Sequence, residues 1–442
     1  MHEAIAGYPT YQEETVTETT VDYRPMWQSL GLDLEAHDML LSAIPALYQQ
    51  AYLTQKDRPE GMSYFDFVMS EIHGLRIKEL QDHKAAGGTV IGTFCLYVPE
   101  EIIRAFGGVA VGLCAGAEWA YDKVEQVLPA NTCALIKSFM GFKLGKVCPY
   151  VESADLIIGE TTCDGKKKAY EIFGEHAPLY VMELPHMKRA QDMVLWRAEL
   201  DRLAAKLQEV SGRPLEAGAL AKAIREVNDK RRALQRLNAA RKASPAPISG
   251  LDALLAVQIA FYDDVPRFTQ MVNAIADELE ARVAAGGGVG AEDAPRLLIT
   301  GSPMSIPNWK LFDIIEKAGA VVVAEEMCTG SRYYEKLVPE TGTTVEEMLD
   351  DIAAKYLDIN CACFTPNQGR VDDVLRLAKE YEVDGVVDYS LRFCAPYTIE
   401  ATSLARAVRQ AGYPYLSIDT AYSAGDVGQL TTRVEAFLEM ID

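Results

Sequence analysis

The feature that most constrains the fold is an alternation of short apolar, β-rich runs with helical stretches. Eight such runs occur, at residues 89–94, 109–113, 155–159, 179–182, 296–301, 320–324, 384–388 and 415–418. Strands that alternate with helices indicate βαβ units, in which the strands lie parallel in one sheet and the helices cover its faces. The sequence therefore predicts an α/β protein.

The strands fall into two groups, separated by sequence with a purely helical pattern. We expect two Rossmann-like parallel-sheet domains, with a helical N-terminal extension and inter-domain helices. The expected boundaries are 1–85 for the extension, 86–187 for the first α/β domain, 188–292 for the helical segment and linker, and 293–442 for the second α/β domain. A glycine run at 286–290 is not followed by Lys-Ser/Thr, so we interpret it as a linker and not as a phosphate-binding P-loop.

Two local signals concern helix boundaries. Pro45 interrupts an apolar stripe in the N-terminal extension, and this predicts a kink or a helix start at that position. Ser249, followed by Asp252, is an approximate capping box and predicts the start of another helix.

The charge balance limits the classes of partner. The chain has 442 residues, with 43 Lys and Arg against 64 Asp and Glu, and a formal net charge of −21. Such a chain repels phosphate backbones and anionic lipids, so we expect neither nucleic-acid nor membrane-surface binding. The longest nearly apolar stretch, at 105–117, is shorter than the ~20 residues of a membrane span. The first residues show no signal-peptide pattern, and we expect a cytoplasmic protein.

Nine cysteines are the main candidates for function. An odd number cannot pair completely within one chain, and in a reducing compartment cysteines are more often metal-binding or catalytic than disulfide-bonded. Seven lie close to expected strand ends or in the segments between strands: Cys95, Cys133, Cys163, Cys328, Cys361, Cys363 and Cys394. Ligands of open parallel sheets bind beyond the carboxyl ends of the strands. We therefore expect cysteines from both domains to converge on one cleft.

The cysteine pattern favours an iron–sulfur cluster over zinc. Zinc sites usually have short CxxC-type spacing, which is absent, and the six histidines are scattered. Helix N-termini after the strands and the run Lys166, Lys167 and Lys168 would place positive charge near an anionic cluster. Cys114, on an expected apolar strand, and Cys148, before a proline, are interpreted as packing residues.

Several motifs carry a family resemblance that covers about residues 30–442. They are GTFCLYVPEE at 92–101, LPANTCALIKS at 128–138, GETTCDGKKK at 159–168, EMCTG at 326–330, CACFTPN at 361–367 and GDVGQLTTRVEAF at 425–437. These segments resemble the 2-hydroxyacyl-CoA dehydratase D-component superfamily, which includes benzoyl-CoA reductase subunits. Within it, the chain is most similar to the double-cubane cluster proteins. It departs from the family in its N-terminal extension and in Ala134, where a proline is common.

The resemblance implies a homodimer in which each subunit holds an [8Fe-9S] double-cubane cluster. It implies six ligands, which we assign to Cys95, Cys133, Cys163, Cys328, Cys363 and Cys394. Cys361 competes with Cys363, because side chains two residues apart in an extended segment point to the same side. The resemblance also implies an ATP-hydrolysing partner reductase with its own [4Fe-4S] cluster, and a small-molecule substrate such as acetylene.

Two other functions stay open. One is a 2-hydroxyacyl-CoA dehydratase or benzoyl-CoA reductase subunit with one [4Fe-4S] cluster, which needs one set of three cysteines. The other is a non-catalytic electron-storage or cluster-carrier protein. The two half-sets of cysteines favour the double cubane. Glu160, Glu326, Arg332 and Arg392 lie close to the assigned ligands, and we favour helix capping or ion pairing over proton delivery for each.

Overall fold

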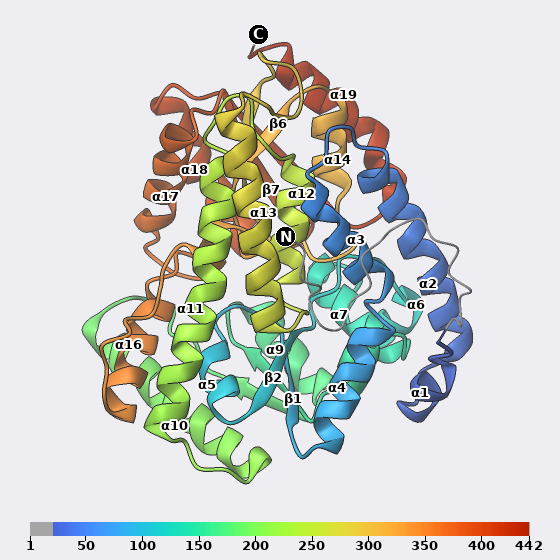
Figure 1. Ribbon diagram of the computed structural model, residues 1–442, viewed down its shortest axis with the longest axis vertical. Helices are drawn as coiled ribbons and strands as arrows, with labels where there is room; N and C mark the ends of the chain where they lie inside the picture. The colour runs from blue at the N-terminus through green and yellow to red at the C-terminus, as the bar shows by residue number, and fades with distance from the viewer. Residues whose placement is uncertain (1–20, 442) are drawn as a thin grey trace, which may run out of the picture.

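The computed structural model describes residues 21–441, and the first twenty residues of the predicted N-terminal extension lie outside that range. Two four-stranded sheets form the framework (Figure 1). The first contains β1 (Thr89–Thr93), β2 (Gly108–Gly112), β3 (Leu156–Glu160) and β4 (Leu179–Met182). The second contains β5 (Arg296–Gly301), β6 (Val321–Glu326), β7 (Gly385–Leu391) and β8 (Tyr415–Thr420).

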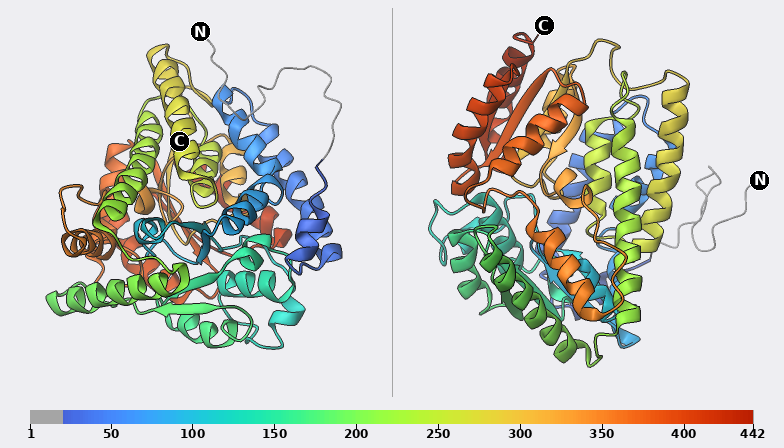
Figure 2. Two further views of the ribbon diagram at one scale, coloured as in Figure 1. Left: turned by 60° about the horizontal axis from the view of Figure 1, so that its bottom comes forward. Right: turned by 90° about the vertical axis from the view of Figure 1, so that its left-hand side faces the viewer.

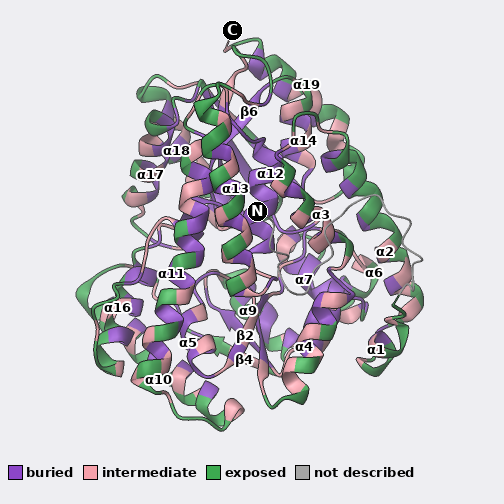
Figure 3. Cartoon of the chain, viewed as in Figure 1, coloured by how far each residue is buried: buried purple, intermediate pink, exposed green. Residues whose placement is uncertain are grey.

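Both sheets have the same topology. Their strand orders are β2-β1-β3-β4 and β6-β5-β7-β8, and every neighbouring pair is parallel. The predicted α/β class with two Rossmann-like sheets is thereby confirmed. All residues of β3, β6 and β7 are buried, as expected where helices cover both faces of a parallel sheet, and each strand begins with an apolar run before it reaches a buried carboxylate. The buried residues concentrate in the strands and on the inner faces of the helices (Figure 3).

The helices that accompany the strands follow the βαβ pattern. In the first half they are α5 (Glu100–Ala105), α6 (Tyr121–Val124), α7 (Ala134–Leu144), α8 (Pro149–Ser153) and α9 (Asp164–Phe173). In the second half they are α14 (Lys310–Lys317), α15 (Ser331–Tyr334), α16 (Val345–Leu357), α17 (Gln368–Glu380), α18 (Ala395–Gln410) and α19 (Val427–Leu438).

Four helices connect the halves: α10 (Ala190–Ser211), α11 (Ala217–Ala240), α12 (Gly250–Ile259) and α13 (Val265–Ala284). The long helix α11 runs beside both halves of the molecule (Figures 1 and 2). Every residue of α12 is buried. Half of the expected capping box is present, since the Asp252 backbone N–H donates to Ser249 Oγ at 3.0 Å. The Asp252 carboxylate instead accepts from the Arg58 guanidinium at 2.9 Å.

The N-terminal segment packs against both halves through α1 (Arg24–Ser29), α2 (Leu34–Tyr48), α3 (Ser63–Ser70) and α4 (Leu75–Ala85). The expectation of a helix start at Pro45 was wrong, because α2 begins at Leu34, where Asp33 caps it, and continues through the proline. A π-helical turn, Gln49–Leu53, follows directly. Within residues 21–441, no helix combines the length and the apolarity needed to cross a membrane.

Candidate functional site: a cysteine-lined cavity between the sheets

A cavity of about 1060 Å³, part of it open to solvent, lies beyond the carboxyl ends of strands from both sheets. Its lining includes Thr93 and Gly112 at the ends of β1 and β2, Ser302 directly after β5, and Leu391 at the end of β7. Eight of the nine cysteines line it: Cys95, Cys114, Cys133, Cys163, Cys328, Cys361, Cys363 and Cys394. The structure thus brings all six assigned ligands together, although their role as ligands stays a prediction.

Three of these cysteines stand at helix N-termini. Cys133, Cys163 and Cys394 are the N-caps of α7, α9 and α18. The Cys163 Sγ accepts a hydrogen bond from the Lys166 backbone N–H at 3.4 Å. Cys163 and Cys394 are also topological equivalents, because each follows the third strand of its sheet. The first backbone N–H groups of a helix have no intrahelical partner, so such positions favour negatively charged sulfur.

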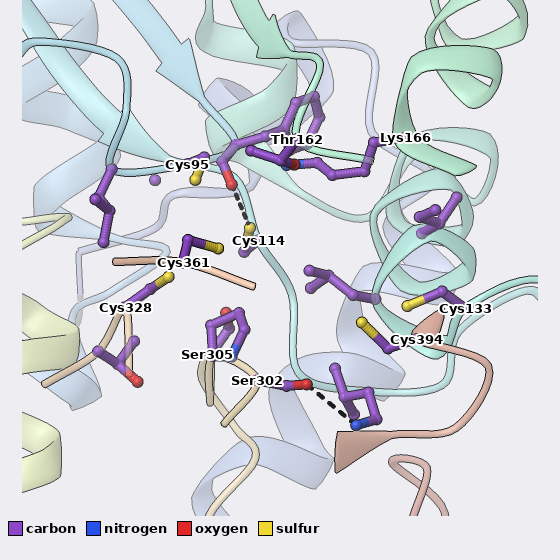
Figure 4. A pocket seen from close by; sticks show the side chains of 18 of the residues that line it. Cys95, Cys114, Cys133, Thr162, Lys166, Ser302, Ser305, Cys328, Cys361 and Cys394 are labelled. Atoms are coloured by element: carbon purple, nitrogen blue, oxygen red, sulfur yellow. Dashed lines mark hydrogen bonds between the residues drawn. The ribbon is translucent and has the colours of Figure 1, made fainter. Parts of the chain in front are cut away.

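Cys114 packs against the core, as expected, but its predicted placement on a strand was wrong. β2 ends at Gly112, and Cys114 lies two residues beyond it, in the wall of the cavity. Its topological equivalent is Cys328, which lies two residues beyond β6, the second strand of the other sheet. The Cys114 thiol donates to the Phe94 carbonyl oxygen at 2.9 Å (Figure 4), and burial raises its pKa to about 11. Cys148 does not belong to the cavity lining.

The turn that contains Cys361 and Cys363 follows α16 and is held on both sides. The Asn367 side-chain amide donates to the Cys361 carbonyl oxygen at 3.0 Å. The Thr365 backbone N–H donates to the carbonyl oxygen of His186, in the connection between β4 and α10, at 2.9 Å. Both thiols line the cavity, so position alone does not separate them.

The cysteine thiols shift one another's pKa in three pairs, namely Cys95 with Cys328, Cys133 with Cys394, and Cys361 with Cys363. The first two pairs join the two halves, and Figure 4 shows Cys133 and Cys394 pointing toward each other. The neighbouring Cys394 thiol lowers the pKa of Cys133 to about 7. The neighbouring Cys363 thiol and the positive charge of Arg332 lower the pKa of Cys361 to about 5. Each of these two pairs therefore has one member that readily becomes a thiolate, the form that binds metal.

Only Lys166, of the three consecutive lysines, lines the cavity. It is buried and forms an ion pair with the fully buried Glu160. Lys167 and Lys168 are about half to two-thirds exposed and pair with carboxylates on the surface. Of the positive charge expected from the three lysines, only the Lys166 ammonium group lies at the cavity, and the Glu160 carboxylate neutralises it.

The ion-pair interpretation of the acid–base candidates is confirmed. Glu326 pairs with Arg332 inside the protein, with 2.7 Å between Oε2 and Nη2. Arg392 pairs with Asp419 at 3.3 Å on the surface. Sequence reasoning missed Tyr397, whose hydroxyl lies 3.5 Å from Cys361 Sγ in the cavity wall. Its position three residues after Cys394, in the first turn of the same helix, was the available signal.

The donor set fits an iron–sulfur cluster. Within residues 21–441, no three His, Cys, Asp or Glu side chains are arranged around the position of a single metal ion. Cluster ligands bind different iron atoms and therefore stand further apart than the ligands of one ion. Thiolates are the ligands that iron–sulfur clusters use, and a thiol-rich cavity with helix N-termini directed at it suits an anionic cluster.

Comparisons with known proteins show the family to which the chain is similar. The family model for the 2-hydroxyglutaryl-CoA dehydratase D-component matches residues 95–441. The protein YjiM of Escherichia coli (strain K12), named as a putative dehydratase subunit, is 40% identical over 369 residues, which cover 82% of this chain and 94% of YjiM. The (R)-phenyllactyl-CoA dehydratase beta subunit of Clostridium sporogenes is 23% identical, over 80% of this chain and 92% of its own length. A benzoyl-CoA reductase subunit of Thauera aromatica is also 23% identical, over 80% of this chain and 90% of its own length.

Proposed function

This chain belongs to the 2-hydroxyglutaryl-CoA dehydratase D-component family, and from this premise we propose that it is an iron–sulfur reductase with an [8Fe-9S] double-cubane cluster. The observation that carries the proposal is the convergence of cysteines from the carboxyl ends of two equivalent sheets on one cavity. A single cubane needs no more than four thiolates, whereas this cavity offers eight.

Each half supplies three ligands in this proposal. The first half contributes Cys95, Cys133 and Cys163, and the second contributes Cys328, Cys394 and one thiol of the Cys361–Cys363 turn. The assignment by resemblance was Cys363, and the contacts of Tyr397 described below favour Cys361 instead. The thiolates bind iron, the N-termini of α7, α9 and α18 stabilise the negative charge, and Lys166 with Glu160 forms a charge-balanced wall. The cluster, when bound, supplies low-potential electron transfer.

The electron source in this proposal is an ATP-hydrolysing reductase that carries its own [4Fe-4S] cluster. Support comes from the family resemblance and from the sequence, in which the glycine run at 286–290 is not followed by the Lys-Ser/Thr of a P-loop. We further propose a homodimer that reduces small molecules. Turnover of acetylene that requires ATP and the partner supports a reductase, and its absence with a loaded cluster favours an electron-storage or carrier protein.

The second candidate is a dehydratase or benzoyl-CoA reductase subunit with one [4Fe-4S] cluster. The names of the relatives favour it, since they are described as dehydratase and reductase subunits. In that case three thiols of one half suffice, and the cysteines of the other half have no ligand role.

The equivalent residues Cys163 and Cys394 separate the two candidates. We expect the Cys163→Ala and Cys394→Ala variants, purified without oxygen, both to lose iron and to change the absorption and electron paramagnetic resonance spectra. Cys148→Ala is the matched control, because its thiol lies outside the cavity lining and its iron content should equal that of the wild type. Full iron content in either Cys163→Ala or Cys394→Ala supports the single cluster.

A further inference from the structure

A chain of buried donors leads from the second sheet to Cys361. Arg332 is buried, and its guanidinium nitrogens Nε and Nη2 bind the Glu326 carboxylate. The remaining nitrogen, Nη1, donates to the Tyr397 hydroxyl oxygen and to the Gly301 carbonyl oxygen at 3.3 Å, and it lies 4.0 Å from the sulfur of Cys328, which lines the cavity together with Tyr397. The Tyr397 hydroxyl in turn lies 3.5 Å from Cys361 Sγ.

The direction of these hydrogen bonds follows from the chemistry of the groups. A guanidinium has only donors and stays protonated in proteins, so the Tyr397 oxygen must accept from Arg332. The single hydroxyl proton of Tyr397 is then free to point at Cys361 Sγ, which becomes the acceptor. Because Arg332 does not release a proton, this chain is unsuited to proton delivery. Instead, the Tyr397 hydroxyl directs its dipole at the Cys361 sulfur, and the Arg332 cation lies on the other side of that hydroxyl.

A second arginine keeps this arrangement rigid. Arg370 donates through Nε to Glu326 Oε2 at 3.1 Å and through Nη2 to Thr300 Oγ1 at 2.9 Å. Its guanidinium carbon lies 4.9 Å from the centre of the Tyr397 ring, and that of Arg332 lies 5.4 Å from it. Tyr397 is thus held by two cations, all within a buried network.

The first half stabilises charge at its own cavity wall in a different way. There the buried cation is Lys166, and its ammonium pairs with Glu160. The two sides of the cavity therefore differ in the group that supplies positive charge, a lysine in the first half and an arginine bonded to a tyrosine in the second.

We propose that Arg332 and Tyr397 are positioning residues that would hold Cys361 as a ligand thiolate and stabilise the reduced state of a bound cluster. This inference rests on the proposed cluster and adds which residues of the chain raise its reduction potential. Hydrogen bonds and positive charge at cluster sulfurs favour the more negative, reduced state and so raise the reduction potential. The step is a one-electron reduction by dithionite or the partner, in which no covalent bond forms or breaks.

The test is a potentiometric titration of the iron-loaded protein, followed by electron paramagnetic resonance. Tyr397→Phe removes only the hydroxyl, and we expect it to keep its iron while its reduction becomes at least tenfold less favourable, a fall of ~59 mV for one electron. The matched control is Tyr381→Phe, which removes a buried hydroxyl bonded to the Asn238 carbonyl oxygen outside the cavity lining and leaves the potential unchanged.

A second variant keeps the test decisive if Tyr397→Phe does not load iron. Arg332→Lys retains the cation but cannot both pair with Glu326 and donate to Tyr397 in the same geometry, so its potential should fall as well. An iron-loaded Tyr397→Phe or Arg332→Lys protein with the wild-type potential overturns the inference. A wild-type protein that holds no iron overturns the proposed function itself.

Discussion

Replacing Glu160 by glutamine tests how far the cavity wall depends on a buried charge pair. The Glu160 side chain is 0% exposed and that of its partner Lys166 is 8% exposed. Removing one member of a buried ion pair leaves the other charge uncompensated and costs about 3–5 kcal/mol. Glutamine keeps one oxygen acceptor for the ammonium, so we expect the lower end, about 3 kcal/mol.

The assay is thermal unfolding of the iron-free protein under reducing conditions, followed by circular dichroism. For 442 residues that unfold as one unit, an unfolding entropy of ~2.1 cal/mol/K per residue amounts to ~0.9 kcal/mol/K. A loss of about 3 kcal/mol then lowers the midpoint by about 3 °C.

The matched control pair lies on α9, the helix that carries Lys166. Glu171 pairs with Lys168 on the surface of α9, with side chains 67% and 65% exposed. An exposed pair contributes about 0–1 kcal/mol, so Glu171→Gln should move the midpoint by no more than about 1 °C. Equal midpoints for Glu160→Gln and Glu171→Gln would refute the reasoning that burial makes the Lys166 pair important.

Three further outcomes are expected. Cys361→Ala should lose more iron on anaerobic purification than Cys363→Ala, because Tyr397 donates to Cys361; the reverse order would assign the ligand to Cys363. Gly116→Ala places a Cβ in steric conflict with the Ser305 carbonyl oxygen across the junction of the halves, so it should lower the free energy of unfolding in urea by about 1–3 kcal/mol. The control Gly218→Ala, whose Cβ meets no other atom, should raise that free energy by about 1 kcal/mol. Burial raises the pKa of Asp388 from 3.8 to about 6, so the folded state keeps a proton that the unfolded chain releases. Stability should therefore fall as the pH rises from 4 to 6, and Asp388→Asn should gain about 2–3 kcal/mol relative to the wild type across that window; parallel pH profiles would contradict this.

The class of the fold was accessible from the sequence because strand and helix periodicities are local properties. All eight predicted runs coincide with strands, and the helical segment after β4 contains no strand until β5. Boundaries were less accessible. Pro45 lacks the backbone N–H that would donate an intrahelical hydrogen bond, but α2 continues on both sides of it. A helix-breaking residue therefore did not mark a helix boundary here.

The site was predicted in part, for a physical reason. Cysteines that follow strand ends could be placed on one edge of a sheet, because parallel strands share the direction of their carboxyl ends. The position of Cys114 in the cavity wall was missed because it depends on where β2 ends and on the pairing of β2 with β1, neither of which its flanking residues reveal. Tyr397, in the cavity wall, and Arg370, which packs against it, were missed because two different helices bring them together through long-range contacts.

The central claim is that six thiolates of one chain hold a double cubane in the cavity between the sheets. Its most direct test is the iron and acid-labile sulfide content of the anaerobically purified protein, measured per chain. The account predicts about eight irons with a matching amount of sulfide. About four irons per chain would contradict it in favour of a single cubane, and protein without iron would contradict every cluster assignment made for this cavity.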